Sequence, residues 1–314
     1  MDVVTFGETM VLFNPLSTGP LRYAGQFEKT IGGAESNVAI GLARLGHQVS
    51  WISRLGEDEF GVYVRNFIRG EGVDTSGVVF DETHPTAVFF KERRAAQESK
   101  VFYYRSGSAA SRMTPNDIKE EDIARAKYLH VTGITPALSE TCKETVLHAI
   151  ALAKKNGVKV VFDPNIRLKI WSKEEARQTL MSIARQCDIV LPGFEEGEML
   201  TEKNTPEDIA NYFIEDGVSL VVVKLGAQGA YYATATEEEY VAGSKVEQIV
   251  DSIGAGDGFA AGFLSGLIRG WTIREAVTLG NKIGAYALTV VGDVEGYPFW
   301  SQVCPEQGDK EVLR

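Results

Sequence analysis

Short apolar runs rich in β-branched residues alternate along the chain with longer amphipathic stretches. This alternation predicts a mostly parallel sheet whose strands are connected by covering helices. Because such crossovers are right-handed, we expect ligand-binding loops at the carboxyl ends of the strands. The predicted strands are Val3–Phe6, Val49–Ser53, Tyr128–Val131, Val158–Phe162, Ile189–Leu191 and Leu220–Lys224.

Two of the amphipathic stretches show the helical pattern clearly. Ser36–Leu45 and Thr141–Asn156 each place apolar residues along one stripe at helical spacing. Gly157 follows the second stretch, and glycine readily adopts the left-handed conformation that ends many helices. The sequence therefore predicts a helix in each stretch, the second ending before Gly157.

Two other stretches, Phe13–Ile31 and Thr86–Tyr104, break the alternation. The first is rich in Gly, Pro and small polar residues, and the second has extended runs at Ala87–Glu92 and Lys100–Tyr104 around a charged turn, 93–99. Both predict antiparallel strands beside the main sheet. A small β lid over the strand ends and an edge hairpin that extends the sheet fit the pattern equally.

The chain shows no internal repeat, low-complexity tract or flexible linker. We therefore predict one domain over residues 1–314, with lid strands inserted at about 13–31 and 86–105. A hydrophobic content of 44% is ample for a core at this length. No apolar run is long enough to predict a membrane span, and residues 1–8 resemble a first strand more than a signal peptide.

The formal charge of −11 narrows the range of partners. Phosphates would be repelled by such a surface, which argues against general nucleic-acid binding and against an anionic membrane surface. An anionic substrate would need local positive charge.

Cys142, Cys187 and Cys304 are odd in number and far apart, which predicts no disulfide framework and a reducing cytoplasm. The four histidines lack zinc-like spacing, so structural or exposed roles are expected.

The most specific chemical feature is the segment 251–263, DSIGAGDGFAAGF. Gly254, Ala255 and Gly256 precede a helical pattern, and small residues there let backbone N–H groups bind an anion, assisted by the helix dipole. Asp257 would then accept the proton of a hydroxyl that attacks a bound γ-phosphate. The alternative is an N-capping Asp after a glycine turn, which explains Asp257 but not the Gly-Ala-Gly before it.

A second feature is the glycine pair that opens the segment Gly32–Gly46. It allows a ligand to contact the backbone, and the nearby Asn37 offers an amide to a polyol. A glycine turn leading into a packed helix is the structural alternative. The P-loop pattern GxxxxGK[ST] is absent, and the Gly-rich segment at 254–258 does not fit a dinucleotide fingerprint.

These two segments resemble the two signatures of the ribokinase family, also called the PfkB carbohydrate kinases. The resemblance extends over nearly the whole chain, through Gly7-Glu8, Arg54–Gly61, Asp163–Arg167 and Lys224–Gly229. Within the family the sequence is most similar to the 2-keto-3-deoxygluconate kinases, through Phe102–Arg105, Gly107–Ala109, Thr132–Ser139 and Gly292–Gly296. The resemblance implies an α/β fold with a mostly parallel central sheet, helices on both faces and a small β-strand lid. It also implies ATP and Mg²⁺ as cofactors.

The resemblance also implies a role for each matching position. Asp257 matches the catalytic base, and Gly254, Ala255 and Gly256 match the anion hole. The positions that match substrate contacts are Gly33, Phe89, Tyr103, Tyr104, Arg105, Arg167, Asp257 and Asp293. Those that match the ATP site are Asn165, Arg167, Lys224, Gly226, Gly229, Gly254, Ala255, Gly256 and Asn281. Glu196 matches a position tied indirectly to magnesium.

The sequence departs from the family pattern at two positions. Gly193 replaces the Asn of the family's NxxE element at Gly193–Glu196, which removes an Asn contact to phosphate but keeps Glu196. Phe89 stands where a tyrosine facing the substrate is expected, so a stacking surface remains without its hydroxyl.

The substrate is predicted from arginine chemistry. A sugar acid carries a carboxylate, which suits the arginine fork, and Arg105 and Arg167 are best placed to bind it. An ion pair is the alternative for either residue.

The expected reaction is ATP-dependent phosphorylation of 2-keto-3-deoxygluconate at the 6-hydroxyl. The alternatives are a kinase for a neutral sugar such as fructose and a non-catalytic sugar-binding regulator. Exposed lid strands also predict a homo-oligomer formed through the lid.

Overall fold

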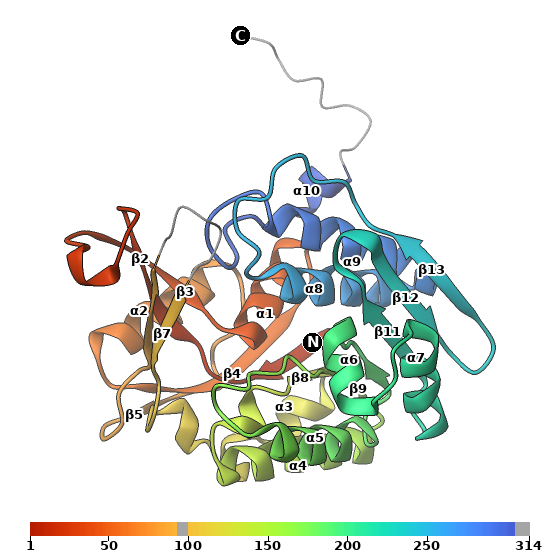
Figure 1. Ribbon diagram of the computed structural model, residues 1–314. Coiled ribbons are helices and arrows are strands. Elements are labelled where there is room, and N and C mark those ends of the chain that lie inside the picture. Colours follow the sequence, from red (N-terminus) through yellow and green to blue (C-terminus); the bar gives the residue numbers. More distant parts are fainter. Residues whose placement is uncertain (93–99, 305–314) are drawn as a thin grey trace.

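The computed structural model describes residues 1–92 and 100–304 (Figure 1). The charged turn predicted at 93–99 lies outside the described residues. Among the described residues, no helix is long and apolar enough to cross a membrane. All three cysteines are free, in agreement with the prediction that they form no disulfide framework.

The main sheet has nine strands in the order β13-β12-β11-β10-β9-β8-β1-β4-β5. Its middle is parallel and its β12 and β13 edge is antiparallel. Every predicted strand is present, although β4 runs to Gly56 and β5, β12 and β13 were not predicted. The strands are β1 (Val3–Phe6), β4 (Val49–Gly56), β5 (Val78–Asp81), β8 (Tyr128–Thr132), β9 (Lys159–Asp163), β10 (Ile189–Val190), β11 (Leu220–Lys224), β12 (Gly229–Ala233) and β13 (Glu238–Ala242).

Helices cover both faces of this sheet, because side chains alternate between the two faces along each strand. Val3 and Val4 of β1, for example, are fully buried in two different apolar clusters. One cluster contains residues of α1 (Ala34–Arg44), α2 (Glu59–Gly70), α8 (Ala255–Ile268) and α9 (Ile273–Ala287). The other contains residues of α3 (Glu120–Ala124), α4 (Glu140–Lys155), α5 (Lys173–Ala184), α6 (Phe194–Thr201) and α7 (Pro206–Glu215). The short α10 (Trp300–Val303) ends the described chain.

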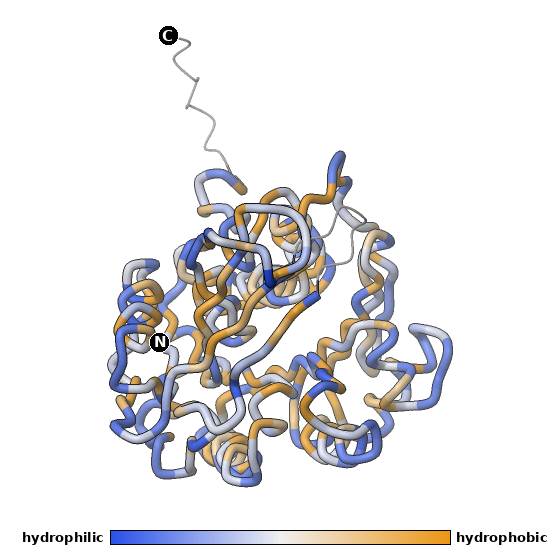
Figure 2. Tube along the Cα trace, turned by 60° about the vertical axis from the view of Figure 1, so that its left-hand side comes forward, coloured by the Kyte–Doolittle hydropathy of each residue, from blue (hydrophilic) through white to orange (hydrophobic). Residues whose placement is uncertain are grey.

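The two predicted helices are confirmed with small shifts. The first, α1, begins two residues before Ser36, directly after the glycine pair. The second, α4, ends at Lys155, and Gly157 has a φ of +69° as the sequence predicted. Figure 2 shows apolar residues concentrated on the inner strands and polar residues on the outer loops.

The two inserted stretches form a separate sheet with the order β3-β2-β6-β7. Its strands are β2 (Met10–Pro15), β3 (Phe27–Gly32), β6 (Val88–Glu92) and β7 (Lys100–Tyr104). The edge-hairpin alternative is therefore wrong, because these strands do not extend the main sheet, and the arrangement fits the lid interpretation. Two of the pairings are antiparallel as predicted, but β2 and β6 are parallel. β2 begins at Met10, earlier than predicted, because Met10 and Leu12 pack with Phe89 on the inner face of the lid.

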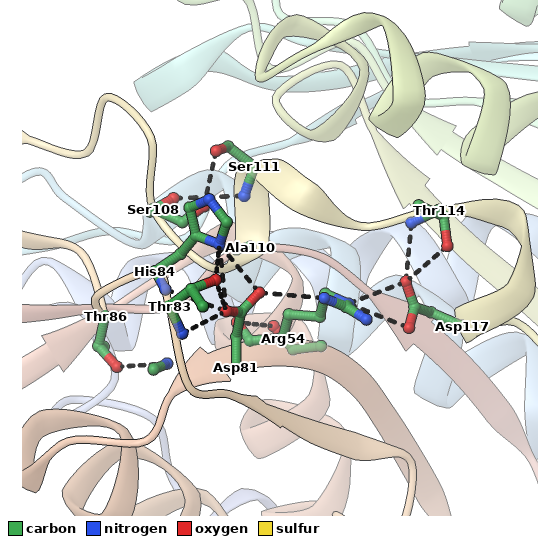
Figure 3. A network of polar contacts seen from close by, with 12 residues as sticks. Arg54, Asp81, Thr83, His84, Thr86, Ser108, Ala110, Ser111, Thr114 and Asp117 are labelled. Carbon is green, nitrogen blue, oxygen red and sulfur yellow. Dashed lines mark hydrogen bonds and ion pairs between the residues drawn. The ribbon is translucent and has the colours of Figure 1, made fainter.

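A polar network fixes the chain where it enters the lid (Figure 3). Arg54 on β4 lies 3.1 Å from Asp81 and 3.1 Å from Asp117. Burial acts to raise the pKa of Asp81, but hydrogen bonds from Thr83 and His84 outweigh it and hold the pKa well below its ordinary value. Asp81 therefore stays ionised and keeps Arg54 paired.

Asp58 provides a second anchor at the same place. Its side chain caps α2 by accepting the Gly61 N–H at 2.7 Å, and its other oxygen accepts the Thr86 N–H at 2.8 Å. An N-cap carboxylate of this kind stabilises a helix by about 0.5–2 kcal/mol. The Arg54–Gly61 motif thus holds the base of the lid, which is a structural role.

Replacing Arg54 should destabilise the fold more than replacing an exposed arginine. Arg54→Met leaves Asp81 and Asp117, both less than 10% exposed, without their cation. Breaking a buried pair costs about 3–5 kcal/mol, so we expect a loss of about 2–4 kcal/mol at this slightly exposed site. Arg125→Met is the matched control, because the Arg125 pairs are exposed and worth about 1 kcal/mol or less. Equal losses in urea denaturation would contradict the anchor.

Candidate active site

The carboxyl ends of the parallel strands meet beneath the lid at one cavity of about 1260 Å³. Glu8 follows β1, Asp163 ends β9 and Lys224 ends β11, and all three line this cavity. Phe89 and Tyr103 line it from the lid. The cavity lies where a parallel sheet is expected to bind its ligand.

The N-terminus of α8 forms one wall of the cavity. Gly254 has a φ of +79°, and a side chain there would overlap the carbonyl oxygen of Asp293. The space around Gly256 is open, since the nearest atom to an added Cβ is the Lys224 ammonium at 3.7 Å. The first N–H groups of a helix have no partner within the helix, so this wall can bind an anion next to the half-buried Lys224 ammonium.

Asp257 lies in the first turn of α8, but it does not cap the helix. The N-cap residue is Gly254, and the helix has no side-chain cap. The Asp257 carboxylate instead accepts hydrogen bonds from Asn37 at 2.8 Å and Asn165 at 3.3 Å. The capping interpretation is therefore wrong, and Asp257 is free to face the cavity.

The environment raises the pKa of Asp257 to about 7. Burial is the largest cause, and the charges of Asp163 and Asp293 act in the same direction. The Asn37 hydrogen bond and the Arg167 charge lower the pKa in part. A carboxyl group with a pKa near neutrality is suited to take up a proton during a reaction.

The turn after β9 directs Asn165 toward Asp257. Asn165 has a φ of +37°, a left-handed conformation that Asn tolerates better than most residues. Its backbone N–H donates to Asp163 at 3.2 Å, which closes the turn. Asp163 also accepts from Lys224 at 2.7 Å, so the turn and the end of β11 are held together.

Glu196 accepts the backbone N–H groups of Ile166 at 2.7 Å and Gly193 at 2.8 Å. Burial raises its pKa, and the charge of Lys224 lowers it. Because both carboxylate oxygens already accept hydrogen bonds, a bridging water suits Glu196 better than direct ligation. The described residues contain no cluster of three or more His, Cys, Asp or Glu arranged for a metal. Magnesium fits here only if phosphate oxygens and water supply most of its ligands, which Mg²⁺ commonly accepts.

The glycine pair Gly32-Gly33 lets the segments around it approach closely. A Cβ on Gly32 would lie 2.7 Å from both Asp293 and Phe89, and one on Gly33 would overlap the Glu8 backbone. Phe89 is 4% exposed and stacks on Tyr103 with ring centroids 5.6 Å apart. Stacked aromatic rings of this kind present an apolar face to a sugar ring.

The two arginines predicted to bind a carboxylate differ in their surroundings. Arg105 forms an ion pair with Glu8 at 2.6 Å, so the ion-pair alternative applies to it. Its Nε is buried and has no hydrogen-bond partner among the described residues. Arg167 is exposed at the cavity wall, beside Lys169, whose ammonium lies 5.7 Å from the centre of the Tyr103 ring.

Tyr104 is not part of this site. Neighbouring residues of a strand face opposite sides, so Tyr104 points away when Tyr103 points inward. Tyr104 is 65% exposed and packs edge-on against Phe90 on the outer face of the lid. The structure therefore does not bring Tyr104 to the cavity that the other predicted substrate contacts line.

The remaining predicted positions line the same cavity, namely Gly226, Gly229, Asn281 and Asp293. Asn281 is buried, and its amide donates to the carbonyls of Val241 and Ala242. Apart from Tyr104, the structure brings every predicted site residue to one cavity.

A sequence profile of the pfkB family carbohydrate kinases matches residues 1–300. The chain belongs to this family. A relative from Bacillus subtilis named 2-dehydro-3-deoxygluconokinase is 41% identical over 95% of this chain and 93% of its own. A rice protein named fructokinase-1 is 36% identical over 94% of each chain.

Solved structures of pfkB kinases have the same fold. The PfkB protein of Polaromonas sp. JS666 is 44% identical, with a TM-score of 0.89 over 96% of this chain and 98% of its own. A Ribokinase II of E. coli, solved in complex with ATP and Mg²⁺, is 28% identical, with a TM-score of 0.90 over 96% of this chain and 97% of its own.

Several residues of this pfkB kinase's cavity were missing from the predicted site. Asp163 and Glu8 stand at the carboxyl ends of predicted strands, which is a signal that could have identified both. Lys91 lies on lid strand β6, outside the cavity lining, and its contacts with Asp251 and Asp293 were also not predicted. Asn37 was noted for its amide, but its contact with Asp257 depends on a fold that brings residues 220 positions apart together.

Proposed function

We propose that this chain phosphorylates 2-keto-3-deoxygluconate at the 6-hydroxyl, with ATP as donor and Asp257 as general base. The product would be 2-keto-3-deoxy-6-phosphogluconate. The name of the Bacillus subtilis relative supports the substrate, and the E. coli complex supports ATP and Mg²⁺ as cofactors. We further propose that residues 1–314 act as a single kinase domain in the cytoplasm.

The observation that carries this proposal is a set of unsatisfied polar atoms in the cavity. Arg105 Nε, Asp293 Oδ1 and Asn37 Oδ1 are buried and have no hydrogen-bond partner among the described residues, although the Lys91 ammonium lies 3.6 Å from Asp293 Oδ1. Buried polar groups are normally hydrogen-bonded, so such atoms indicate where a ligand completes the network. One donor on an arginine and two acceptors match a polyhydroxylated acid.

The reaction would proceed as an in-line transfer. As the 6-hydroxyl oxygen attacks the γ-phosphorus, its proton passes to Asp257, a new P–O bond forms and the bond to the ADP oxygen breaks. The Gly254–Gly256 amides and the Lys224 ammonium would stabilise the transferring phosphoryl group. Magnesium, when bound, would neutralise charge on the phosphates. Phe89 and Tyr103 on the lid would exclude water that could otherwise hydrolyse ATP.

The positive charge for an acidic substrate would come from two sources. The charge of Arg105 is balanced by Glu8, so Arg105 would act mainly as an oriented donor through its free Nε. Arg167 and Lys169 are exposed cations at the same cavity and would supply net attraction. In a chain with a charge of −11, such local cations are needed to hold an anion.

A neutral hexose such as fructose is the second candidate substrate, favoured by the identity to the rice fructokinase. A non-catalytic sugar-binding regulator is the third possibility. The raised pKa of Asp257 and its position beside the helix N-terminus favour a catalyst, because a regulator has no use for a base there. A kinase assay on a panel of acidic and neutral sugars distinguishes the three.

Replacing Asp257 should abolish most turnover. Asp257→Asn is expected to lower kcat by about 10²–10⁴-fold while ATP and sugar still bind, because only proton transfer is lost. Asp257 must be ionised to act, so the wild-type rate should rise with pH through the pKa of about 7. Steady-state kinetics from pH 5 to 9 tests both points. Near-normal turnover of Asp257→Asn would remove the residue from the mechanism.

Arginine replacement should alter substrate preference. The wild-type enzyme should prefer 2-keto-3-deoxygluconate to fructose, and Arg105→Leu should weaken this preference by about ten- to a hundredfold because a charged hydrogen bond is lost. Arg167→Leu should lower turnover on every sugar, since Arg167 would also face the transferred phosphate. A wild-type ratio of kcat/KM near or below one would contradict the acid-sugar assignment without affecting the fold.

We also propose that two copies associate through the outer face of the lid. Phe13, Phe27, Phe90 and Tyr104 form an aromatic cluster there, and all four are at least partly exposed. Such a cluster on short strands favours association with a second apolar surface.

A charge in this cluster should separate the copies. Tyr104→Asp is expected to convert dimers into monomers in sedimentation experiments, because a carboxylate cannot be buried unpaired. Tyr240→Asp, on the edge strand β13, is the control and should leave the mass unchanged. A wild-type protein that sediments as a monomer would refute this assembly.

A further inference from the structure

Lys91 is a charged residue on the inner side of the lid. Its side chain is only 3% exposed, and it follows Phe89 by two positions on β6, so both side chains project from the same face of the strand. A buried ammonium is costly unless it is paired. Its partners therefore indicate what this position of the lid does.

The partners of Lys91 are two carboxylates from segments outside the lid. The ammonium donates to Asp251 Oδ2 at 3.1 Å and lies 3.6 Å from Asp293 Oδ1. Asp251 in turn accepts the backbone N–H of Ile253 at 3.2 Å, directly before the glycines of the anion-binding wall. Lys91 thus connects the lid to the loop that begins α8.

The second partner connects Lys91 to the proposed base. Asp293 Oδ2 lies 3.5 Å from the Asn37 amide, and the same amide donates to Asp257 at 2.8 Å. The backbone of Asp293 also touches Gly254, where no side chain would fit. Asp293 therefore borders both the base and the anion-binding wall.

The local charges show why a cation is needed at this point. The environment raises the pKa of Asp293 to about 6. Burial is the largest cause and the charges of Glu295 and Asp251 act in the same direction, whereas the Lys91 charge lowers this pKa. Asp257 adds another carboxyl group, connected through Asn37. Lys91 is the cation that faces both Asp251 and Asp293 among the described residues. Without it, acidic groups of two loops would repel one another across the site.

We propose that Lys91 is a positioning residue for phosphoryl transfer, which holds the α8 anion-binding loop and the Asp293 carboxylate in place from the lid. The proposal rests on the proposed function, because it assigns the loop and Asp257 to catalysis. Among the described residues, Lys91 neither lines the cavity nor pairs with Asp257, so it acts through Asp251 and Asp293. The position of the lid strand is thereby coupled to the geometry of the reacting groups.

Lys91→Met tests this role. It should lower kcat by about ten- to a hundredfold, the scale of a small misplacement of reacting groups, while KM for ATP changes by less than about threefold. The acidic limb of kcat/KM for the sugar should also move up by about half a pH unit or more, because losing a cation raises the pKa values of the coupled Asp293 and Asp257 pair. Lys91→Arg should restore most of the rate and the pH limb.

Lys29→Met is the matched control. Lys29 lies on lid strand β3 with its ammonium 3.9 Å from the Tyr63 ring, and it is exposed, so its loss should change neither kcat nor the pH limb. If Lys91→Met does not fold, Lys91→Gln keeps a polar head group and takes its place. A kcat within twofold of wild type in the Lys91 variant that folds, Lys91→Met or Lys91→Gln, would overturn the proposal. Lower thermal stability with an unchanged pH limb would also overturn it, since Lys91 would then be only structural.

The result can be separated from a failure of the proposed function. If Asp257→Asn kept its turnover, the proposed base would be wrong whatever Lys91→Met does. If Asp257→Asn lost turnover while Lys91→Met behaved like the Lys29→Met control, only the positioning role would be overturned. Loss in both Asp257→Asn and Lys91→Met, with rescue by Lys91→Arg, supports both.

Discussion

The structure depends on how it holds the buried Asp257 carboxyl group in the first turn of α8. Asp257 lies at the positive end of α8, which favours its anionic form, but burial and two nearby carboxylates favour its protonated form. Amide donors from Asn37 and Asn165 offset part of the burial. The balance leaves the pKa near neutrality, and the surrounding loops are arranged to preserve it.

Buried ion pairs between different elements maintain this arrangement. Lys224 joins the end of β11 to the turn after β9, and Arg105 joins the segment after β7 to the segment after β1. Lys91 joins β6 to two loops of the core. Removing one partner of a buried pair leaves an uncompensated charge, so each pair resists separation more strongly than its net contribution to stability suggests. The lid and the strand ends are therefore coupled through charge as well as through packing.

Much of the fold follows from the sequence because parallel strands bury both faces and read as short apolar runs. β1 and β11 match the prediction residue for residue. The edge strand β13 was missed because its Glu238–Ala242 sequence is polar and mostly exposed, which gives no strand signal. In the site, glycine-rich turns identified Asp257. Pairings such as Arg105 with Glu8 connect positions far apart in the sequence, so no local pattern reveals them.

The pairing of Arg105 changes how specificity for the proposed acidic substrate would arise. A guanidinium whose charge is already balanced by Glu8 adds little net attraction for an anion, but its unbonded Nε still has a fixed direction. A donor with a fixed direction favours substrates of matching geometry, because a substrate oxygen must lie where the donor points. Net attraction must then come from exposed cations such as Arg167 and Lys169, which water and salt screen. Recognition of an acidic sugar would thus divide between a buried group that orients it and surface groups that attract it.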